Sequence, residues 1–175
     1  MEPLLHFIIP FTFLTLAGVR FKTALTLSIL AVLPDLDALL QVHRSLTHSA
    51  VVLTLLVASA WLITCKTRIQ VSLPLTLLTV ISHPILDLFT GYTPILWPLT
   101  QSSLQVQAEL TVHIGSFPTL GLTLRLYSCK ALFNRFQSLD APLFTSEGLI
   151  TSTMLIAPIM GKMFRERLLH RFSRG

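Results

Sequence analysis

The residues of this chain that could bind a metal ion or move protons are concentrated in three short motifs. The first holds two aspartates, the second two histidines and an arginine, and the third a histidine and an aspartate. Carboxylates and imidazoles bind divalent cations and also serve as general acids and bases. The motifs are PDLD at Pro34–Asp37, HRSLTH at His43–His48 and SHPILD at Ser82–Asp87, with a separate His6 near the N-terminus.

The third motif has the spacing of two residues on one face of a helix. His83 and Asp87 are four positions apart, about one turn, so a helix would let both side chains address a single ion. A lone pair with this spacing is more often hydrogen-bonded than metal-binding. The motif therefore indicates a metal site only in combination with the other two.

The first two motifs require an irregular backbone. Asp35 and Asp37 are two positions apart, too far round a regular helix to share a face. Pro34 interrupts the helix, and in a locally extended or kinked segment both carboxylates could bracket a metal. His43 and His48 are five positions apart, and a turn leading into the next apolar run could bring them together.

A divalent cation would offset the repulsion between several aspartates that lie close together beside histidines. Ionised, unpaired acids repel, whereas a cation neutralises them and takes neutral imidazole as a ligand. A mixed nitrogen and oxygen set suits Zn, Mn or Fe. Because the candidates exceed what one tetrahedral ion needs, either two ions bind or some residues support ligands or act as acid and base. The predicted ligands are Asp35, Asp37, His43, His48, His83 and Asp87, with His6 equally open as a ligand, a cap or an interfacial polar group.

The elements that would position these motifs are predicted to be membrane-spanning helices. Of the 175 residues, 52% are hydrophobic and only 12% are charged, and the mean hydropathy is +0.71. An ordinary soluble domain is roughly 25% charged, which argues against a water-soluble monomer. The pattern favours an all-α multi-pass membrane protein with about five transmembrane helices. The apolar runs cover residues 3–19, 24–40, 49–65, 71–89 and 148–161.

Basic residues predict the orientation of these spans. Lys and Arg collect at cytoplasmic ends, and here they follow the first, third and last runs. With an outside N-terminus and a cytoplasmic C-terminus, all three groups of basic residues lie on the cytoplasmic side. Every polar motif then lies at the non-cytoplasmic face. Basic loops beside membrane spans also account for the net charge of +5, so the charge does not require a nucleic-acid partner. The groups are Arg20 with Lys22, Lys66 with Arg68, and the tail from Lys162 to Arg174.

The long connection after the fourth run is predicted to contain strands. Apolar and polar residues alternate over 104–114 and again over 120–126, with Gly115 and Pro118 between them, which indicates a β-hairpin. An interfacial helix over 119–136 is the competing interpretation, and a sixth span there would move the basic tail outside. The chain thus divides into a metal-site core at 1–100, a loop at 101–147, and a last span with its basic tail at 148–175.

At the polar motifs the chain resembles the YdjM family of membrane-bound proteins, whose assignment as metal-dependent hydrolases rests on motifs. The resemblance implies a multi-pass protein of the inner or plasma membrane. Two positions depart from the family pattern: Ser45 stands where Gly is common, and Ala38 stands where an acidic residue or histidine often follows. The resemblance covers about residues 1–100, through Leu33–Asp37, His43–Ser49, Ser82–His83 with Asp87, Thr90–Pro98, and His6 in the place of an early histidine.

Two classes of function fit these residues. A metal-dependent hydrolase would use the cation to activate water and polarise a phosphoryl or acyl oxygen, with one of the carboxylates as general base. The predicted catalytic residues are Asp37, Arg44 on an anionic substrate oxygen, and Thr47 orienting a ligand or water. A site at the bilayer interface suggests membrane lipids as surroundings and an amphiphilic ester or phosphoester as substrate. The alternative is a metal-ion or proton-coupled transporter, or a protein that uses the ion only to hold its helices together.

Overall fold

The computed structural model describes residues 2–65, 72–138 and 142–172, with the side chains of 163 and 166–172 left out. Five α-helices, two 3₁₀ helices and one two-stranded sheet occur in these residues. The predicted cytoplasmic markers Lys66, Arg68 and Arg174 lie outside the described residues. The chain forms two compact units, Met1–Leu33 with Leu139–Gly175, and Pro34–Ser138.

The first unit is helical and contains α1 (Pro3–Leu16), α2 (Phe21–Val32) and α5 (Ser146–Phe172). An edge-to-face contact between Phe11 and Phe21, with ring centroids 5.5 Å apart, packs α1 against α2. The Glu2 carboxylate accepts hydrogen bonds from the backbone N and the Oγ1 of Thr145, just before α5. His6 lies on α1 and has no exposed surface.

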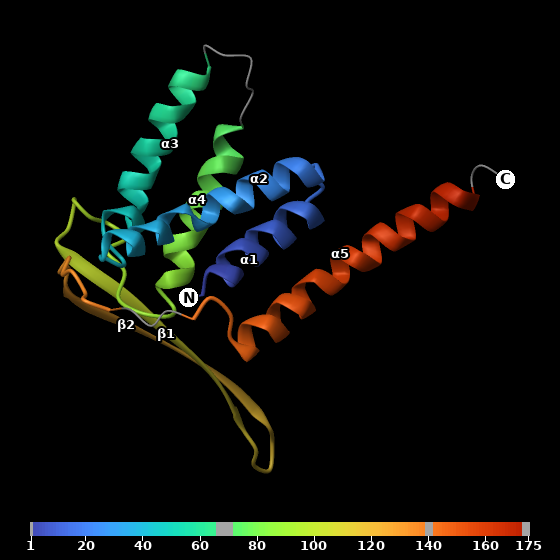
Figure 1. Ribbon diagram of the computed structural model, residues 1–175. Helices are drawn as coiled ribbons and strands as arrows, with labels where there is room; N and C mark the ends of the chain where they lie inside the picture. The colour runs from blue at the N-terminus through green and yellow to red at the C-terminus, as the bar shows by residue number, and fades with distance from the viewer. Residues whose placement is uncertain (1, 66–71, 139–141, 173–175) are drawn as a thin grey trace. The chain divides into compact units, whose positions relative to one another are not determined.

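The second unit contains η1 (Leu33–Leu40), η2 (Leu46–His48), α3 (Ala50–Thr64), α4 (Leu73–Asp87), β1 (Ser102–His113) and β2 (Thr119–Lys130) (Figure 1). α3 packs against α4. The loop after α4 returns to the start of α3, where the backbone N of Ala50 donates to the carbonyl of Ile95 at 2.9 Å. The backbone N of Val106 in β1 donates to the carbonyl of Leu88 at 2.8 Å. These bonds fix the start of α3 and the end of α4 at one end of the unit.

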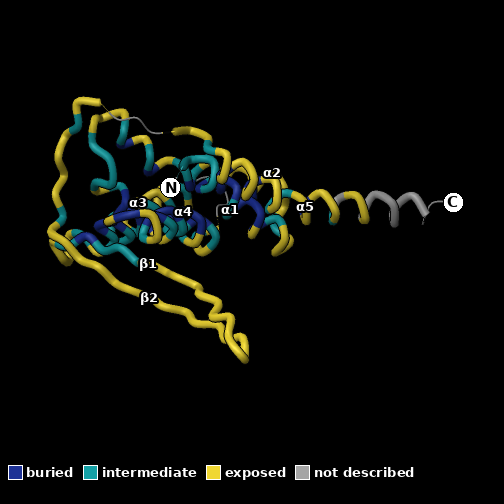
Figure 2. The backbone as a smooth tube through the Cα atoms, turned by 90° about the horizontal axis from the view of Figure 1, so that it is seen from below, coloured by how far each residue is buried: buried dark blue, intermediate teal, exposed yellow. Residues whose placement is uncertain are grey.

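The predicted hairpin is confirmed. β1 and β2 pair antiparallel, and their register sets Val106 opposite Leu126 and Leu110 opposite Leu122. Directly opposed residues share a face, so one face of the ribbon is apolar and the other polar. Both strands are exposed along most of their length (Figure 2). The competing helix over 119–136 is wrong, because period-two alternation there forms β2.

The helices begin near the predicted runs but differ from them in length. In the described residues, one helical stretch, Phe21–Leu40, is long and apolar enough to cross a membrane, while α1, α3 and α4 are shorter apolar helices. A 15-residue helix measures about 22 Å, against roughly 30 Å of hydrocarbon. α5 is longer than the predicted last run, continuing past Gly161 to Phe172. The structure therefore shows a mostly helical chain, and the five-span arrangement stays a prediction.

Candidate metal centre

The first motif lies on a 3₁₀ helix rather than on the extended or kinked segment expected around Pro34. α2 ends at Val32 and the chain tightens into η1. A 3₁₀ run of 8 residues is unusually long. Proline has no N–H to continue the α-helical ladder, which favours the change at this point.

Asp35 and Asp37 project from η1 to the two ring nitrogens of one histidine. Asp35 Oδ1 lies 3.6 Å from His48 Nε2, and Asp37 Oδ2 lies 3.3 Å from His48 Nδ1. The two carboxylates therefore lie on either side of the imidazole of His48, and the prediction that they bind a metal is compatible with this position.

The second motif forms the turn that brings His43 and His48 together. Arg44 has a φ of 54°, in the left-handed region that non-glycine residues seldom adopt, and η2 follows at once. The ring centroids of the two histidines are 5.2 Å apart. Ser49 then caps α3, its Oγ accepting a hydrogen bond from the backbone N of Val52.

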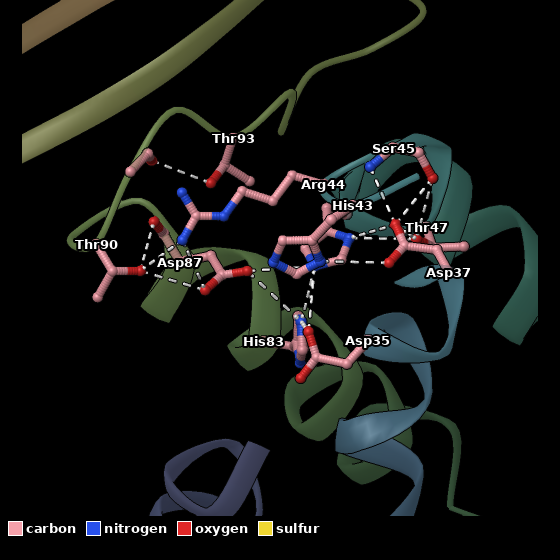
Figure 3. Close-up of polar contacts among 12 residues, drawn as sticks. Asp35, Asp37, His43, Arg44, Ser45, Thr47, His83, Asp87, Thr90 and Thr93 are labelled. Atoms are coloured by element: carbon pink, nitrogen blue, oxygen red, sulfur yellow. Dashed lines mark hydrogen bonds and ion pairs between the residues drawn. The ribbon is translucent and has the colours of Figure 1, made fainter. Parts of the chain in front are cut away.

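The third motif lies on the last turn of α4. His83 Nε2 is 3.7 Å from Asp87 Oδ2, and both residues are fully buried. The pair does not stand alone. His48 Nε2 lies 3.1 Å from His83 Nε2 and 3.2 Å from Asp87 Oδ2. The three predicted motifs therefore meet at one place, as Figure 3 shows for Asp35, His83 and Asp87.

Four atoms of this cluster lie at separations close to those of a tetrahedral cation site. Bonds of about 2.0–2.1 Å to a central ion give ligand separations of about 3.3–3.4 Å. In addition to the distances already given, His83 Nε2 is 3.3 Å from Asp35 Oδ1. Five of the six pairwise separations thus lie between 3.1 and 3.7 Å, and the donor set of two nitrogens and two oxygens suits Zn, Mn or Fe. The atoms are Asp35 Oδ1, His48 Nε2, His83 Nε2 and Asp87 Oδ2.

His43 extends the cluster on its exposed side. Ligand atoms of Asp35, His43 and His48 lie within 4.8 Å of one another, as do those of Asp35, His83 and Asp87. The side chain of His43 is 30% exposed, against 12% for Asp35 and none for His48. The two groups share Asp35, so the cluster has ligands for one ion or for two adjacent ions.

Asp37 is surrounded by hydrogen-bond donors. Its Oδ2 accepts from the backbone N of Ser45 at 3.1 Å, from Ser45 Oγ at 2.9 Å and from Thr47 Oγ1 at 2.8 Å. Its Oδ1 lies 3.4 Å from His43 Nδ1. Asp37 belongs to neither group of potential ligand atoms. The turn after η1 thus engages both oxygens of Asp37, and its role as a ligand or catalytic residue stays a prediction.

The carboxylates change the protonation of His48, which lies in the connection before α3. Burial alone lowers the pKa of this imidazole. Contacts with Asp35, Asp37 and Asp87 oppose that effect and raise the pKa to about 10. The three carboxylates therefore favour a positive charge at this imidazole, which a proton or a bound cation would supply.

Arg44 lies beside the centre, and its guanidinium contacts Thr90 and Gly91, to which the sequence had assigned no role in the site. Its Nη2 donates to Thr90 Oγ1 at 2.9 Å and lies 3.6 Å from Asp87 Oδ1. The guanidinium packs on Gly91, where a Cβ atom would overlap Nη1. Ser45 was likewise missed as a donor to Asp37. Small and hydroxyl residues next to each predicted ligand were the available signal.

These motifs lie within the stretch that matches a known family. A family model described as YdjM inner membrane protein matches residues 1–163. The chain belongs to this family. The match to the YdjM model extends past the first hundred residues to cover the hairpin and most of α5. Neither the curated proteins nor the solved structures gave a match. As a YdjM-family chain, it is a membrane protein with a His/Asp cluster able to hold a metal ion.

Proposed function

We propose that this chain is a membrane-bound, metal-dependent hydrolase of an amphiphilic ester or phosphoester. The observation that carries the proposal is the convergence of Asp35, His48, His83 and Asp87, with five of the six ligand-atom separations between 3.1 and 3.7 Å. A divalent ion held there would supply Lewis-acid polarisation of a substrate oxygen and a lowered pKa for bound water, provided that its coordination expands beyond these four ligands or that one of them gives way. His43 is not one of these four ligands, so it could bind a second ion or transfer protons.

The protein's own residues would prepare the site before substrate arrives. Asp37 holds His48 through Nδ1, which directs Nε2 toward the other three ligands. Thr47 donates to Asp37 and its Oγ1 lies 3.2 Å from His48 Nδ1, so it helps orient the ring. The side chains of His43 and Arg44 are 30% and 21% exposed, whereas those of His48 and Asp87 have no exposure. Substrate would therefore enter past His43 and Arg44.

We place this site at the non-cytoplasmic face of a five-span protein, with membrane lipids around it. The charge distribution of the connections and the basic tail supports an outside N-terminus and a cytoplasmic C-terminus. The meeting of η1, of η2 just before α3 and of the end of α4 supports a common face for all three motifs. A site at the interface favours a substrate with one polar and one apolar part.

Metal content of the protein purified in detergent tests the proposal. We expect bound Zn, Mn or Fe in the wild type, and its loss in His48→Ala and Asp87→Ala. His113→Ala is the matched control, because His113 is exposed at the end of β1 and outside both ligand groups. Unchanged metal in both site variants would exclude the centre. His6→Ala in the same series decides whether His6 is a ligand.

Hydrolysis of chromogenic esters and phosphoesters in mixed micelles tests the enzymatic part. We expect turnover to vanish on chelation, to return with the bound metal, and to be lost in Asp87→Asn. Complete burial of His48, His83 and Asp87 favours a second candidate, an ion that only holds helices together. Tight metal binding, a lower melting temperature after chelation and no turnover would establish that second function.

A further inference from the structure

Arg44 is held beside the candidate metal centre by two residues that follow α4. Thr90 Oγ1 accepts a hydrogen bond from Arg44 Nη2 at 2.9 Å and lies 3.3 Å from Asp87 Oδ1. Gly91 supplies the surface beneath the guanidinium. A Cβ atom at position 91 would overlap Nη1 and come within 2.9 Å of Cζ, so no larger residue fits while Arg44 stays in place.

The backbone also adapts to this placement. Arg44 adopts a φ of 54°, which a residue with a side chain keeps only where its surroundings hold it there. The turn thereby directs the arginine toward Asp87, whose Oδ2 lies 3.2 Å from His48 Nε2 while its Oδ1 faces Arg44. One carboxylate therefore separates the guanidinium from the centre.

The guanidinium retains donors for a ligand. Nη2 is used by Thr90 and Asp87, Nε has no hydrogen-bond partner among the described residues, and 21% of the side chain is open to an approaching ligand. An arginine offers five N–H groups in a planar fork that matches the oxygens of phosphate. A divalent cation at the centre would cancel the charges of Asp35 and Asp87, which leaves the charge of Arg44 for a further anion.

We infer that Arg44, positioned by Thr90 and Gly91, is an anion-binding arm and that the substrate is an anionic phosphoester rather than a neutral ester. The inference rests on the proposed function and narrows its substrate class. Arg44 would contact the substrate, whereas Gly91 and Thr90 act through Arg44 and are positioning residues.

Binding of inorganic phosphate to the metal-loaded protein, followed by calorimetry, tests the arm directly. Losing charged hydrogen bonds predicts roughly tenfold weaker phosphate binding in Arg44→Gln. Gly91→Ala should weaken phosphate binding to a similar degree, and Gly161→Ala should not, because a Cβ at position 161 meets nothing within 4 Å. Phosphate affinity unchanged in Arg44→Gln would overturn the inference.

A double variant distinguishes positioning from folding. If Gly91 acts through Arg44, adding Gly91→Ala to Arg44→Ala has no further effect on phosphate affinity, because the crowded guanidinium is gone. A further loss in the double variant would show that Gly91 supports the fold instead. Metal content of each variant, measured alongside, reports whether the centre is intact.

Two substrates separate this inference from the proposed function. Arg44→Gln should reduce turnover of bis-p-nitrophenyl phosphate at least tenfold more than that of neutral p-nitrophenyl butyrate. An equal loss on both would refute the anion-binding arm and leave the hydrolase standing. Arg44-dependent phosphate binding with no turnover of either compound would uphold the arm and refute the hydrolase.

Discussion

Asp37 and Asp87 are buried aspartates with different surroundings. Asp87 Oδ2 faces His48 and His83, whereas Asp37 Oδ2 accepts from Ser45 and Thr47. We expect Asp37→Asn to keep the metal but to weaken its affinity by about 10–100-fold, the usual cost of losing a partner behind a ligand.

Asp87→Asn is the matched variant and should lose more affinity, since it replaces a proposed ligand. Competitive titration with a chelating dye measures both. Equal losses in the two variants would show that Asp37 is itself a ligand.

His48 predicts how stability of the metal-free protein depends on pH. Its pKa rises from the usual 6.5 to about 10 on folding. A raised pKa adds stability that is full below about 6.5 and is lost as the pH rises through about 10. The melting temperature of chelated protein should therefore fall over this range, and fall less in His48→Gln. Identical pH profiles for the two proteins would contradict the prediction, because other titrating groups are common to both.

Part of the site follows from residue spacing, and part does not. The helical period places His83 and Asp87 on one face whatever surrounds them, so their proximity was predictable. The role of Asp37 depends on donors from a turn with a positive φ at Arg44, and that of Gly91 on a close approach across the fold. Neither a turn of this kind nor a close contact between distant residues leaves a periodic pattern in the sequence.

Among the elements, the hairpin has the most distinctive surface. Val106, Leu110, Leu122 and Leu126 share its apolar face, and the partners on the other face are polar. A two-stranded sheet has open edges and so cannot cross hydrocarbon, but it can lie at the interface. We expect the apolar face to contact acyl chains.

Spin labels at single cysteines test this arrangement in a background with both native cysteines replaced by serine. A label at Leu122 should be more accessible to oxygen, and one at Thr123 to a polar nickel reagent, with the pattern alternating along β2. Equal accessibility at neighbouring positions would place the ribbon in water.

Element boundaries were predictable where a composition change coincides with a structural one. α3 begins beside Ser49, a capping residue, and ends near the predicted limit. α5 continues beyond its apolar run because Lys and Arg are good helix formers, so a charged tail does not end a helix. Hydropathy thus located the apolar part of α5 but not the residue at which the helix ends.

At the scale of the whole molecule, the two native cysteines report the topology. Cys65, at the C-terminal end of α3, and Cys129, in β2, are both free and exposed. The five-span arrangement places Cys65 at the cytoplasmic face and Cys129 outside. A membrane-impermeant maleimide on intact cells should therefore label Cys65→Ser and leave Cys129→Ser unlabelled.

Lysed cells supply the control, since both variants should then react. Labelling of Cys129→Ser in intact cells would show that the orientation is the opposite of the proposed one. The polar motifs would then face the cytoplasm.

The gradient of burial across the centre has a kinetic consequence. His48, His83 and Asp87 have no exposed surface, so local opening of the surrounding helices would limit how fast an ion held by them leaves. Exchange with the medium would then be governed by the rate of that opening rather than by affinity. The ion found in freshly isolated protein would accordingly record which metal the cell supplied while the chain was folding.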